Sequence, residues 1–567
     1  MPYKFNCQDR NYSKWDIVDA ASLKETKADL TNPSKYKLFN QDIFTMEEGN
    51  IKILHSSARS MKCIPGVLVL EGNKRYGKIK KNRYLYRCVP DDKRFPEFLT
   101  AYSPKIKFNK KMENKYIVFK FKSWNEKHPI CEIVQTIGDV GKLENFYEYQ
   151  LYCKSLYASI QDFRKKTIKA LKVKSEEAFI EEMKEKYNSE DRIDWDIITI
   201  DPSLSKDFDD GLSLVEYEDS YLFSIYISNV SFWMDALDLW NSFSQRITTI
   251  YLPDRKRPML PTVLSDALCS LQENCMRFAF TLDVCVDKKN NEIKDVTFKN
   301  CCIRVRKNFR YDTEEQENDQ KYKSIKEFIL KLNKKYRYVD NIDSSHDIIA
   351  YSMILMNYLA AKEMLKYKTG IFRTAKLSSN FVPPNNVPSD VVKFLKMWNS
   401  FGGKYVKFNE VEGHDMLELD AYIHITSPIR RLVDLLNIIE LQNVLGIVDL
   451  GESSKEFYKK WTSPEMFEYI NVTMRSVRKV QNDCALLNIC VNDERIRNKC
   501  HKGFIFDKIH RNDGLYQYMV YFPEIKMVNR FTSRHNKKNL SNQNFRLFIF
   551  LDEIRLKQKI RVEMASD

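Results

Sequence analysis

Residues 199–214 read Thr-Ile-Asp-Pro-Ser-Leu-Ser-Lys-Asp-Phe-Asp-Asp-Gly-Leu-Ser-Leu and hold four aspartates within ten positions. These aspartates are Asp201, Asp207, Asp209 and Asp210. Apolar residues 197–200 come before the acidic stretch and residues 211–214 follow it, which predicts two strands joined by an acidic loop. Four carboxylates in one loop raise each other's pKa unless a cation neutralises them. The loop therefore predicts a cation site between two strands.

A magnesium site explains this loop better than two alternatives. Mg²⁺ takes oxygen ligands, and two such ions about 3.5–4 Å apart can activate a water and stabilise a leaving oxygen in phosphodiester hydrolysis. A calcium loop of the EF-hand type needs glycine at its sixth position, where counting from Asp207 or Asp201 gives Leu212 or Lys206. A solvated acidic turn stays open, because aspartate and glycine are favoured turn residues. We prefer the metal site, since strands flank the loop on both sides.

A second motif occupies residues 424–439, which read His-Ile-Thr-Ser-Pro-Ile-Arg-Arg-Leu-Val-Asp-Leu-Leu-Asn-Ile-Ile. Ser427 is a favourable N-cap and Pro428 a favourable first helical residue, so the spacing predicts a helix that begins here. The apolar residues that follow repeat at helical spacing and predict one buried face. Arg430 and Arg431 would then lie in the first turn of that helix.

The two arginines are unusual at a helix start. The helix dipole disfavours cations there by about 0.3–1 kcal/mol each. An ion pair between Arg430 and Asp434 would offset about 0.3–0.5 kcal/mol of this cost, and that structural explanation stays open. A phosphate bound at the helix start would explain both arginines, and we prefer this hypothesis.

The composition indicates a multidomain globular protein with a polyanionic partner. The chain has 567 residues, of which 43% are hydrophobic and 30% charged, with a formal net charge of +15. At roughly 150 residues per domain we expect three or four domains. Net positive charge favours a polyanion as partner. It lies mainly in residues 61–130, with a net charge of +12, and 501–567, with +6.

Several classes of protein are not expected. The N-terminal residues lack the apolar core of a signal peptide. The most apolar stretch, residues 348–361, is shorter than the about 20 residues of a membrane span. Thirteen cysteines are scattered without a CxxC pair, which argues against a disulfide scaffold or a zinc ribbon. We therefore expect an intracellular, cytoplasmic protein without a membrane partner.

Short strands are predicted in both basic segments. Small basic barrels with exposed aromatic side chains bind single-stranded nucleic acid, because bases stack while phosphates meet Lys and Arg. A small β domain with a solvated lysine-rich face is the alternative. The candidate strands are residues 66–70, 84–89, 116–121, 516–522 and 545–551. Helices are predicted at 142–187, 323–338 and 347–366, and a polar surface loop at 311–321.

Together these motifs closely resemble the RNase II/RNase R (RNB) family of 3′→5′ exoribonucleases. The resemblance includes the acidic stretch Thr199–Asp210 and the later Thr426–Arg431. Three motifs between them also resemble the family, in the expected order: Tyr251-Leu252-Pro253, Met259-Leu260-Pro261 and Leu268-Cys269-Ser270-Leu271.

The resemblance implies an α+β multidomain fold, with a mixed α/β RNB catalytic domain flanked by small OB-like β-barrels. It implies the following division of the chain: residues 1–60, an N-terminal arm or degenerate barrel; 61–145, a basic cold-shock-like barrel; 146–190, a helical connector; 191–500, the RNB catalytic domain; and 501–567, a C-terminal OB-like RNA-binding domain.

The resemblance also implies Mg²⁺-dependent hydrolysis of single-stranded RNA from its 3′ end to nucleoside 5′-monophosphates by two metal ions, with Mn²⁺ as an alternative. Asp209 and Arg430 would be catalytic, Arg430 by stabilising charge on the scissile phosphate. The other assigned roles are metal binding by Asp201, Asp207, Asp209 and Asp210, and substrate binding by Tyr251, Phe372, Arg430, Arg431 and Gln481, the two aromatic rings clamping the terminal base.

Three positions depart from the family pattern. Asn229 stands where relatives usually have Asp, Gln481 where they have Glu, and Leu432 where Tyr is common. These changes leave two alternatives open. One is an RNA-binding protein with the RNB fold and impaired catalysis, and the other is an exonuclease with relaxed sugar specificity. The sequence identifies no protein partner.

Overall fold

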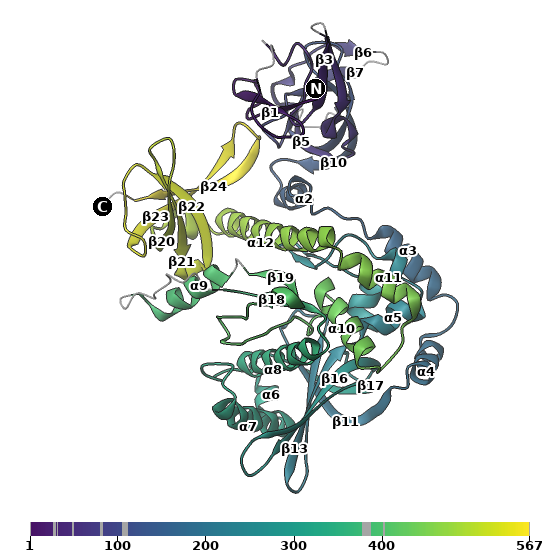
Figure 1. Cartoon of the computed structure of the whole chain (residues 1–567). Coiled ribbons are helices and arrows are strands. Elements are labelled where there is room, and N and C mark those ends of the chain that lie inside the picture. Colours follow the sequence, from purple (N-terminus) through teal and green to yellow (C-terminus); the bar gives the residue numbers. More distant parts are fainter. Residues whose placement is uncertain are drawn as a thin grey trace. The chain divides into compact units, whose positions relative to one another are not determined.

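The computed structural model describes residues 2–565 except 27–29, 31, 48–49, 80–82, 105–111, 377–386 and 401–402. The chain forms two compact units (Figure 1). The first unit comprises Met1–Tyr157, Leu252–Asp254 and Arg478–Asp567. The second comprises Ala158–Tyr251 and Arg255–Val477, and it holds the acidic loop.

A closed five-stranded barrel forms the centre of the second unit. Its strand order is β11-β12-β13-β16-β17. Strand β11 pairs antiparallel with β12 and parallel with β17. The strands are β11 (Glu190–Asp201), β12 (Asp210–Glu216), β13 (Ser220–Ser228), β16 (Met276–Asp287) and β17 (Ile293–Arg310). The strands predicted on both sides of the acidic loop are thus confirmed.

Helices and two short hairpins complete the second unit. The helices of the unit are α3 (Gln161–Ala170), α4 (Glu176–Lys186), α5 (Val230–Ala236), α6 (Glu314–Asn318), α7 (Gln320–Lys335), α8 (Ser345–Lys366), α9 (Ser389–Ser400), α10 (Leu432–Val444), α11 (Gly451–Trp461) and the first part of α12 (Pro464–Asn492). Hairpin β14–β15 consists of Ile250–Tyr251 and Lys256–Arg257, and hairpin β18–β19 of Ile371–Thr374 and Lys404–Lys407.

Two secondary-structure predictions outside the arginine motif were wrong. The predicted surface loop 311–321 contains α6 and the start of α7, because Thr313 and Asp319 cap these helices with their side chains. The predicted helix 142–187 is three helices, since α2 (Leu143–Cys153) ends before Ser155, whose φ is +55°. Ser175 then caps α4.

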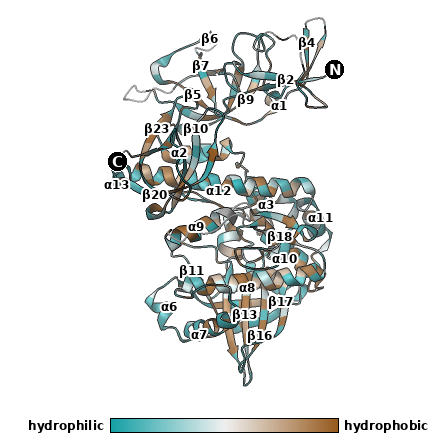
Figure 2. Cartoon of the chain, turned by 60° about the vertical axis from the view of Figure 1, so that its left-hand side comes forward, coloured by the Kyte–Doolittle hydropathy of each residue, from teal (hydrophilic) through white to brown (hydrophobic). Residues whose placement is uncertain are grey.

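Helix α8 confirms the prediction for residues 347–366 and belongs to the core. It begins with a capping box between Ser344 and Asp347. In the part of the chain that the structure describes, α8 alone is long and apolar enough to cross a membrane, but 56% of its apolar window is buried. Its buried side chains pack with those of β13 and β16, whose strands are largely brown in Figure 2. A core helix accounts for this apolar stretch.

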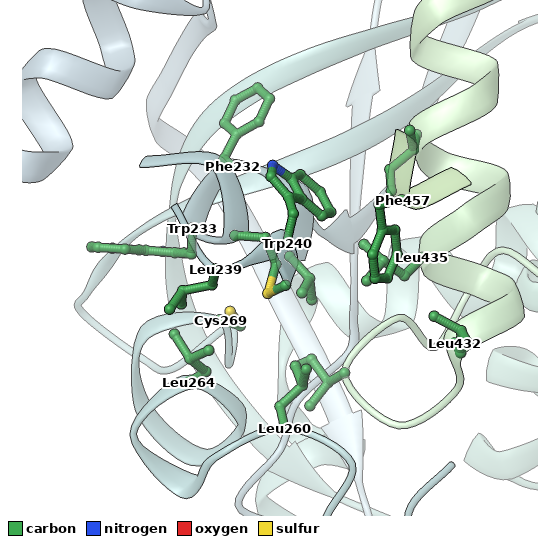
Figure 3. Close-up of a cluster of buried hydrophobic side chains, with 14 of the residues drawn as sticks. Phe232, Trp233, Leu239, Trp240, Leu260, Leu264, Cys269, Leu432, Leu435 and Phe457 are labelled. Carbon is green, nitrogen blue, oxygen red and sulfur yellow. The ribbon is translucent and has the colours of Figure 1, made fainter. Parts of the chain in front are cut away.

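A second core cluster holds α10 against the rest of the unit. Leu432 and Leu435 of α10 pack with Leu260 and Leu264 and with Phe457 of α11 (Figure 3). All five side chains are buried. This packing fixes the start of α10, and with it the segment that carries Arg430 and Arg431.

The first unit contains three sheets. The N-terminal sheet has the order β2-β1-β3-β4, with β1 (Tyr3–Cys7), β2 (Trp15–Asp19), β3 (Ile43–Glu47) and β4 (Asn50–His55). A six-stranded sheet, β5-β9-β10-β8-β7-β6, curls so that β5 also pairs with β7; its strands are β5 (Ile64–Val69), β6 (Lys78–Ile79), β7 (Arg83–Pro90), β8 (Phe98–Tyr102), β9 (Lys115–Ser123) and β10 (Ile130–Asp139).

The third sheet lies near the C-terminus. Its order is β22-β21-β20-β23-β24. The strands are β20 (His501–His510), β21 (Tyr516–Phe522), β22 (Met527–Ser533), β23 (Asn542–Asp552) and β24 (Lys557–Met564). The short helices of the unit are α1 (Ser57–Ser60) and α13 (Glu494–Asn498). The strands predicted in both basic segments are confirmed, and so is the multidomain fold that combines small β domains with a mixed α/β domain.

A buried ion pair ties β11 to β16. Arg192 is 2% exposed and Asp283 5% exposed, and the guanidinium donates both Nη1 and Nη2 to the carboxylate, at 2.8 and 2.5 Å. We expect Asp283→Ala to lower the free energy of unfolding by about 3–5 kcal/mol, because it leaves the buried Arg192 with the partly exposed Glu190 alone as its ionic partner among the described residues. Urea unfolding followed by circular dichroism measures this loss.

The control for this prediction is Arg94→Ala. Arg94 pairs with Asp92 at the surface, where its side chain is 50% exposed. Exposed pairs contribute at most about 1 kcal/mol. Equal losses in Asp283→Ala and Arg94→Ala would contradict the structural role of the buried pair.

Candidate functional site

The acidic loop connects two neighbouring strands of the barrel. Asp201 is the last residue of β11 and Asp210 the first of β12, so the barrel fixes both backbones. Asp207 and Asp209 lie in the connecting segment. Ser270 holds that segment, because its hydroxyl accepts the Phe208 N–H at 3.0 Å and donates to the Lys206 carbonyl at 2.8 Å.

Asp209 joins the loop to the arginine motif. Its carboxylate is 4% exposed and accepts the Ile429 backbone N–H at 3.0 Å and the Arg430 Nε–H at 3.2 Å. Its own carbonyl accepts the Ser228 N–H at 2.8 Å. Residues more than 200 positions apart in the sequence are thereby brought together.

The arginine motif does not begin a helix at Pro428, so that prediction was wrong. Helix α10 starts at Leu432, and Arg431 occupies the N-cap position. The backbone at the start of α10 forms hydrogen bonds with residues 247–249 instead. The Arg430 carbonyl accepts the Thr249 N–H at 2.9 Å, and the Leu432 N–H donates to the Ile247 carbonyl at 2.9 Å. These tertiary bonds replace the first helical turn.

The two arginines have different partners. The side chain of Arg430 is 46% exposed, and besides Asp209 it donates from Nη2 to the Ser427 hydroxyl at 3.0 Å. Arg431 donates to Asp434 at 2.8 Å, and the fully buried Asp434 also accepts the Ser427 N–H. The pair Arg431–Asp434 therefore forms in place of Arg430–Asp434. Arg430 contacts Asp209 of the acidic loop, whereas Arg431 stabilises the start of α10 through Asp434.

Tyr251 lies beside the aspartates. It belongs to β14 and is 44% exposed. The segment that leads to it, Ile247–Thr249, is bonded to the arginine motif. Tyr251 pairs with Lys256, whose Nζ contacts Asp207, and burial together with the charge of Asp207 raises the pKa of the phenol.

Two other predicted substrate-binding residues do not join this group. Phe372 in β18 is fully buried, pairs with Val406 and belongs to the core that contains α8, so no base can stack on its ring in this fold. The predicted clamp role for Phe372 was wrong. Gln481 lies in the part of α12 that belongs to the first unit, whereas the aspartates belong to the second.

The acidic loop carries more negative charge than its neighbours balance. Burial raises the pKa of Asp201 far above its ordinary value, and the nearby Asp210 and Asp209 carboxylates add to the rise. Burial raises the pKa of Asp210 as well. The pKa of Asp209 rises to about 7 through burial, although the positive charge of Arg430 opposes this effect. Carboxylates of this kind favour a bound cation.

Asp201 and Asp210 fit a divalent cation such as Mg²⁺. The Oδ2 atom of Asp201 is buried and makes no hydrogen bond to any described residue. Asp207 and Asp209 already contact Lys256 and Arg430. Among the described residues no group of three or more His, Cys, Asp or Glu side chains is gathered around one metal position. The donor chemistry therefore fits a hard cation held through the Asp201–Asp210 pair.

Sequence reasoning missed two neighbours of the loop. The Nζ of Lys256 contacts Asp207 at 2.8 Å. The Tyr311 N–H donates to the Asp201 carbonyl at 3.1 Å, and burial, together with the charges of Asp210 and Asp201, raises the pKa of the Tyr311 phenol. Tyr311 follows directly after β17, whose pairing with β11 brings it there. That parallel pairing leaves no local signal in the sequence.

Comparison with known families identifies the domain that holds this site. Residues 189–337 match the family described as RNB domain, and residues 85–149 match the Dis3-like cold-shock domain 2. The chain contains an RNB domain. The matched region includes the four aspartates and Tyr251, whereas Arg430 lies beyond it.

Ribonuclease R proteins are among the relatives of this chain. Ribonuclease R of Chlamydia pneumoniae is 26% identical over 304 residues, which cover 42% of this chain and 45% of that protein. Ribonuclease R of Mycoplasmopsis pulmonis is 33% identical over 175 residues, 29% of this chain and 24% of that protein. The chain thus matches less than half the length of these relatives.

Solved structures share the fold. RNase R of Mycoplasma genitalium, in complex with ribose-methylated single-stranded RNA, has a TM-score of 0.68 and 15% identity over 99% of this chain and 100% of that chain. Yeast Ssd1, a pseudonuclease, has a TM-score of 0.57 and 12% identity over 94% of this chain and 78% of that chain. At these identities the likeness shows a shared fold alone.

The residues that depart from the family pattern in the second unit are part of the core. Asn229 is 1% exposed and donates to Asn300 and Gln442 at 3.0 and 3.1 Å, and it accepts from Ser231. Leu432 belongs to the hydrophobic cluster of α10. Asn229 and Leu432 therefore belong to the packed interior of the unit that holds the site.

We expect Asp201→Asn to raise the melting temperature of the metal-free protein at pH 7.5. The raised pKa means that the folded state binds protons more readily than the unfolded state, so stability falls as pH rises above about 4. Each kcal/mol recovered corresponds to about 2–4 °C in a domain of this size. Thermal unfolding in EDTA at pH 5 and 7.5 measures the gain, which should shrink at pH 5.

Asp340→Asn is the control, because that carboxylate is 99% exposed. Mg²⁺ should stabilise the parent protein more than Asp201→Asn. A lower melting temperature for Asp201→Asn in EDTA at pH 7.5 would contradict the unbalanced charge at this loop.

Proposed function

We propose that the protein is a Mg²⁺-dependent hydrolytic 3′→5′ exoribonuclease that degrades single-stranded RNA to nucleoside 5′-monophosphates. The observation that carries the proposal is the contact of Asp209 with Ile429 and Arg430, which brings a cationic side chain to a loop with excess negative charge. The RNB domain and the ribonuclease R relatives support the same reaction class.

We assign a different role in the reaction to each residue of the site. Asp201 and Asp210 would hold Mg²⁺, which when bound would supply positive charge to polarise the phosphate and to acidify a water. The half-exposed Arg430 donates to the non-bridging oxygens of the scissile phosphate as their charge grows. Asp209 holds Arg430 in place for this task.

The reaction is a hydrolysis. Water adds to the phosphorus while the bond to the 3′ oxygen of the preceding nucleotide breaks, and that oxygen takes a proton. The shortened RNA keeps a 3′ hydroxyl and the released nucleotide carries a 5′ phosphate. The exposed ring of Tyr251 stacks on the terminal base, a contact that tolerates every base.

The basic sheets of the first unit would bind the remainder of the RNA. We propose the domains 61–145 and 501–567 for this role, because the net positive charge of the chain is concentrated in these regions. The segments 1–60 and 146–190 would serve as an added β domain and a connector to the catalytic domain 191–500. Discrimination against DNA would depend on the ribose 2′-hydroxyl, and the glutamine at position 481 leaves relaxed sugar selection as an outcome to test.

A second candidate is an RNA-binding protein with impaired catalysis. The observation that favours it is the contact between Lys256 and Asp207, which engages one predicted metal ligand with a protein cation. The pseudonuclease Ssd1 has the same fold. RNA binding without products in any divalent metal would support this candidate.

One assay separates these candidates. RNA and DNA of the same sequence are incubated with and without Mg²⁺, and the products are separated by chromatography. We expect mononucleotides from RNA only, and a loss of at least about 100-fold in Asp209→Asn, because Arg430 then loses its anchoring charge. Asp340→Asn should keep the parent rate. Equal release from DNA would indicate relaxed sugar selection.

The two neighbouring arginines should differ. We expect Arg430→Ala to lower kcat about 100–1000-fold, since it removes a donor to the transition state. Arg431→Ala should instead lower the melting temperature, because it leaves the buried Asp434 without its cation. Steady-state kinetics and thermal unfolding of both variants check this, and an equal kcat for Arg430→Ala and the parent would contradict the proposed role.

A further inference from the structure

Lys256 is a cation built into the acidic site. It belongs to β15, and its side chain is 24% exposed. The Nζ lies 2.8 Å from Asp207 Oδ1 and 3.0 Å from Asp266 Oδ1. Asp207 and Asp266 are 10% and 20% exposed. The ammonium group is thus held between two carboxylates that are largely removed from solvent.

Asp266 is positioned to hold this lysine. It lies in the short helical turn Leu264–Leu268, whose Leu264 and Leu268 are buried in the core cluster of α10. The Ser265 hydroxyl donates to its Oδ1 at 2.5 Å, and Gln272 donates to its carbonyl at 2.7 Å. This fixed acceptor distinguishes Lys256 from a flexible surface lysine.

The β14–β15 hairpin determines the face to which the Lys256 side chain projects. Tyr251 and Lys256 are directly opposite in the β14–β15 pairing, and opposite residues of an antiparallel pair project to the same face. The ammonium group and the proposed base-stacking ring therefore share one face of the hairpin. A nucleotide stacked on Tyr251 would have its phosphate near Lys256 and Arg430.

We propose that Lys256 takes the place of one divalent cation, so that this protein binds a single Mg²⁺, through Asp201 and Asp210. The proposal rests on the proposed function for its catalytic meaning. A divalent ion and an ammonium group repel each other at one carboxylate oxygen, and the Asp207 Oδ1 atom is already bonded to Lys256. Asp209 is likewise bonded to Arg430. Lys256 thus acts as a positioning residue that keeps Asp207 neutralised and leaves one metal position.

Titration of the full chain with Mn²⁺, followed by electron paramagnetic resonance, counts the bound ions without need of hydrolysis. The expected result is one tightly bound Mn²⁺ in the parent protein and in Lys256→Arg, and two in Lys256→Met. Lys326→Met is the matched control, because Lys326 pairs with Glu317 away from the site, and it should bind one ion.

Two tight ions in the parent protein would overturn the proposal whether or not any variant folds. A single ion in a Lys256→Met protein with a parent-like circular dichroism spectrum would overturn it as well. The kinetic counterpart is the Mg²⁺ dependence of RNA hydrolysis. We expect a Hill coefficient near one in the parent and Lys256→Arg, and a cooperative dependence with at least a tenfold higher half-saturating Mg²⁺ concentration in Lys256→Met.

The two proposals fail in different ways. One Mn²⁺ per chain without any release of nucleotides from RNA would contradict the proposed function and leave the metal count intact. Nucleotide release by a protein that binds two Mn²⁺ would contradict the role of Lys256 and leave the proposed function intact.

Discussion

The contact of the Asp209 carboxylate with the Ile429 N–H and the Arg430 guanidinium is the constraint on which the site depends. One partner comes from a barrel loop and the other from the segment before α10, more than 200 residues later. The barrel fixes the first, and the cluster around Leu432 and Leu435 fixes the second. The barrel and the α10 cluster thereby place the Arg430 guanidinium against the aspartates of the acidic loop.

The aspartates of the acidic loop lower the stability of the fold in the absence of a bound cation. Burial and mutual repulsion raise the pKa of Asp201, and its Oδ2 atom has no hydrogen-bond partner among the described residues. Arg430 and Lys256 neutralise Asp209 and Asp207, which leaves the pair Asp201 and Asp210 for a metal ion. The unfavourable charge in the free protein is the same charge that would bind Mg²⁺ in the active one.

The sequence was sufficient where local patterns decide structure, and insufficient where distant segments meet. The strands that end at Asp201 and begin at Asp210 were predicted correctly from the apolar residues on each side of the acidic loop. The helix predicted from Pro428 was wrong because the backbone at Arg430 bonds to Thr249 instead. Phe372 was misassigned because its motif does not reveal that its ring is buried. Lys256 was missed because only the fold brings it to Asp207.

The proposed function requires that this site hydrolyse the terminal phosphodiester linkage of RNA. It is tested most directly by incubating the protein with single-stranded RNA and Mg²⁺ in ¹⁸O-labelled water and weighing the products by mass spectrometry. We expect nucleoside 5′-monophosphates with one ¹⁸O atom in the phosphate group. Unlabelled nucleotides, nucleotides with a 3′ phosphate, or intact RNA would contradict it.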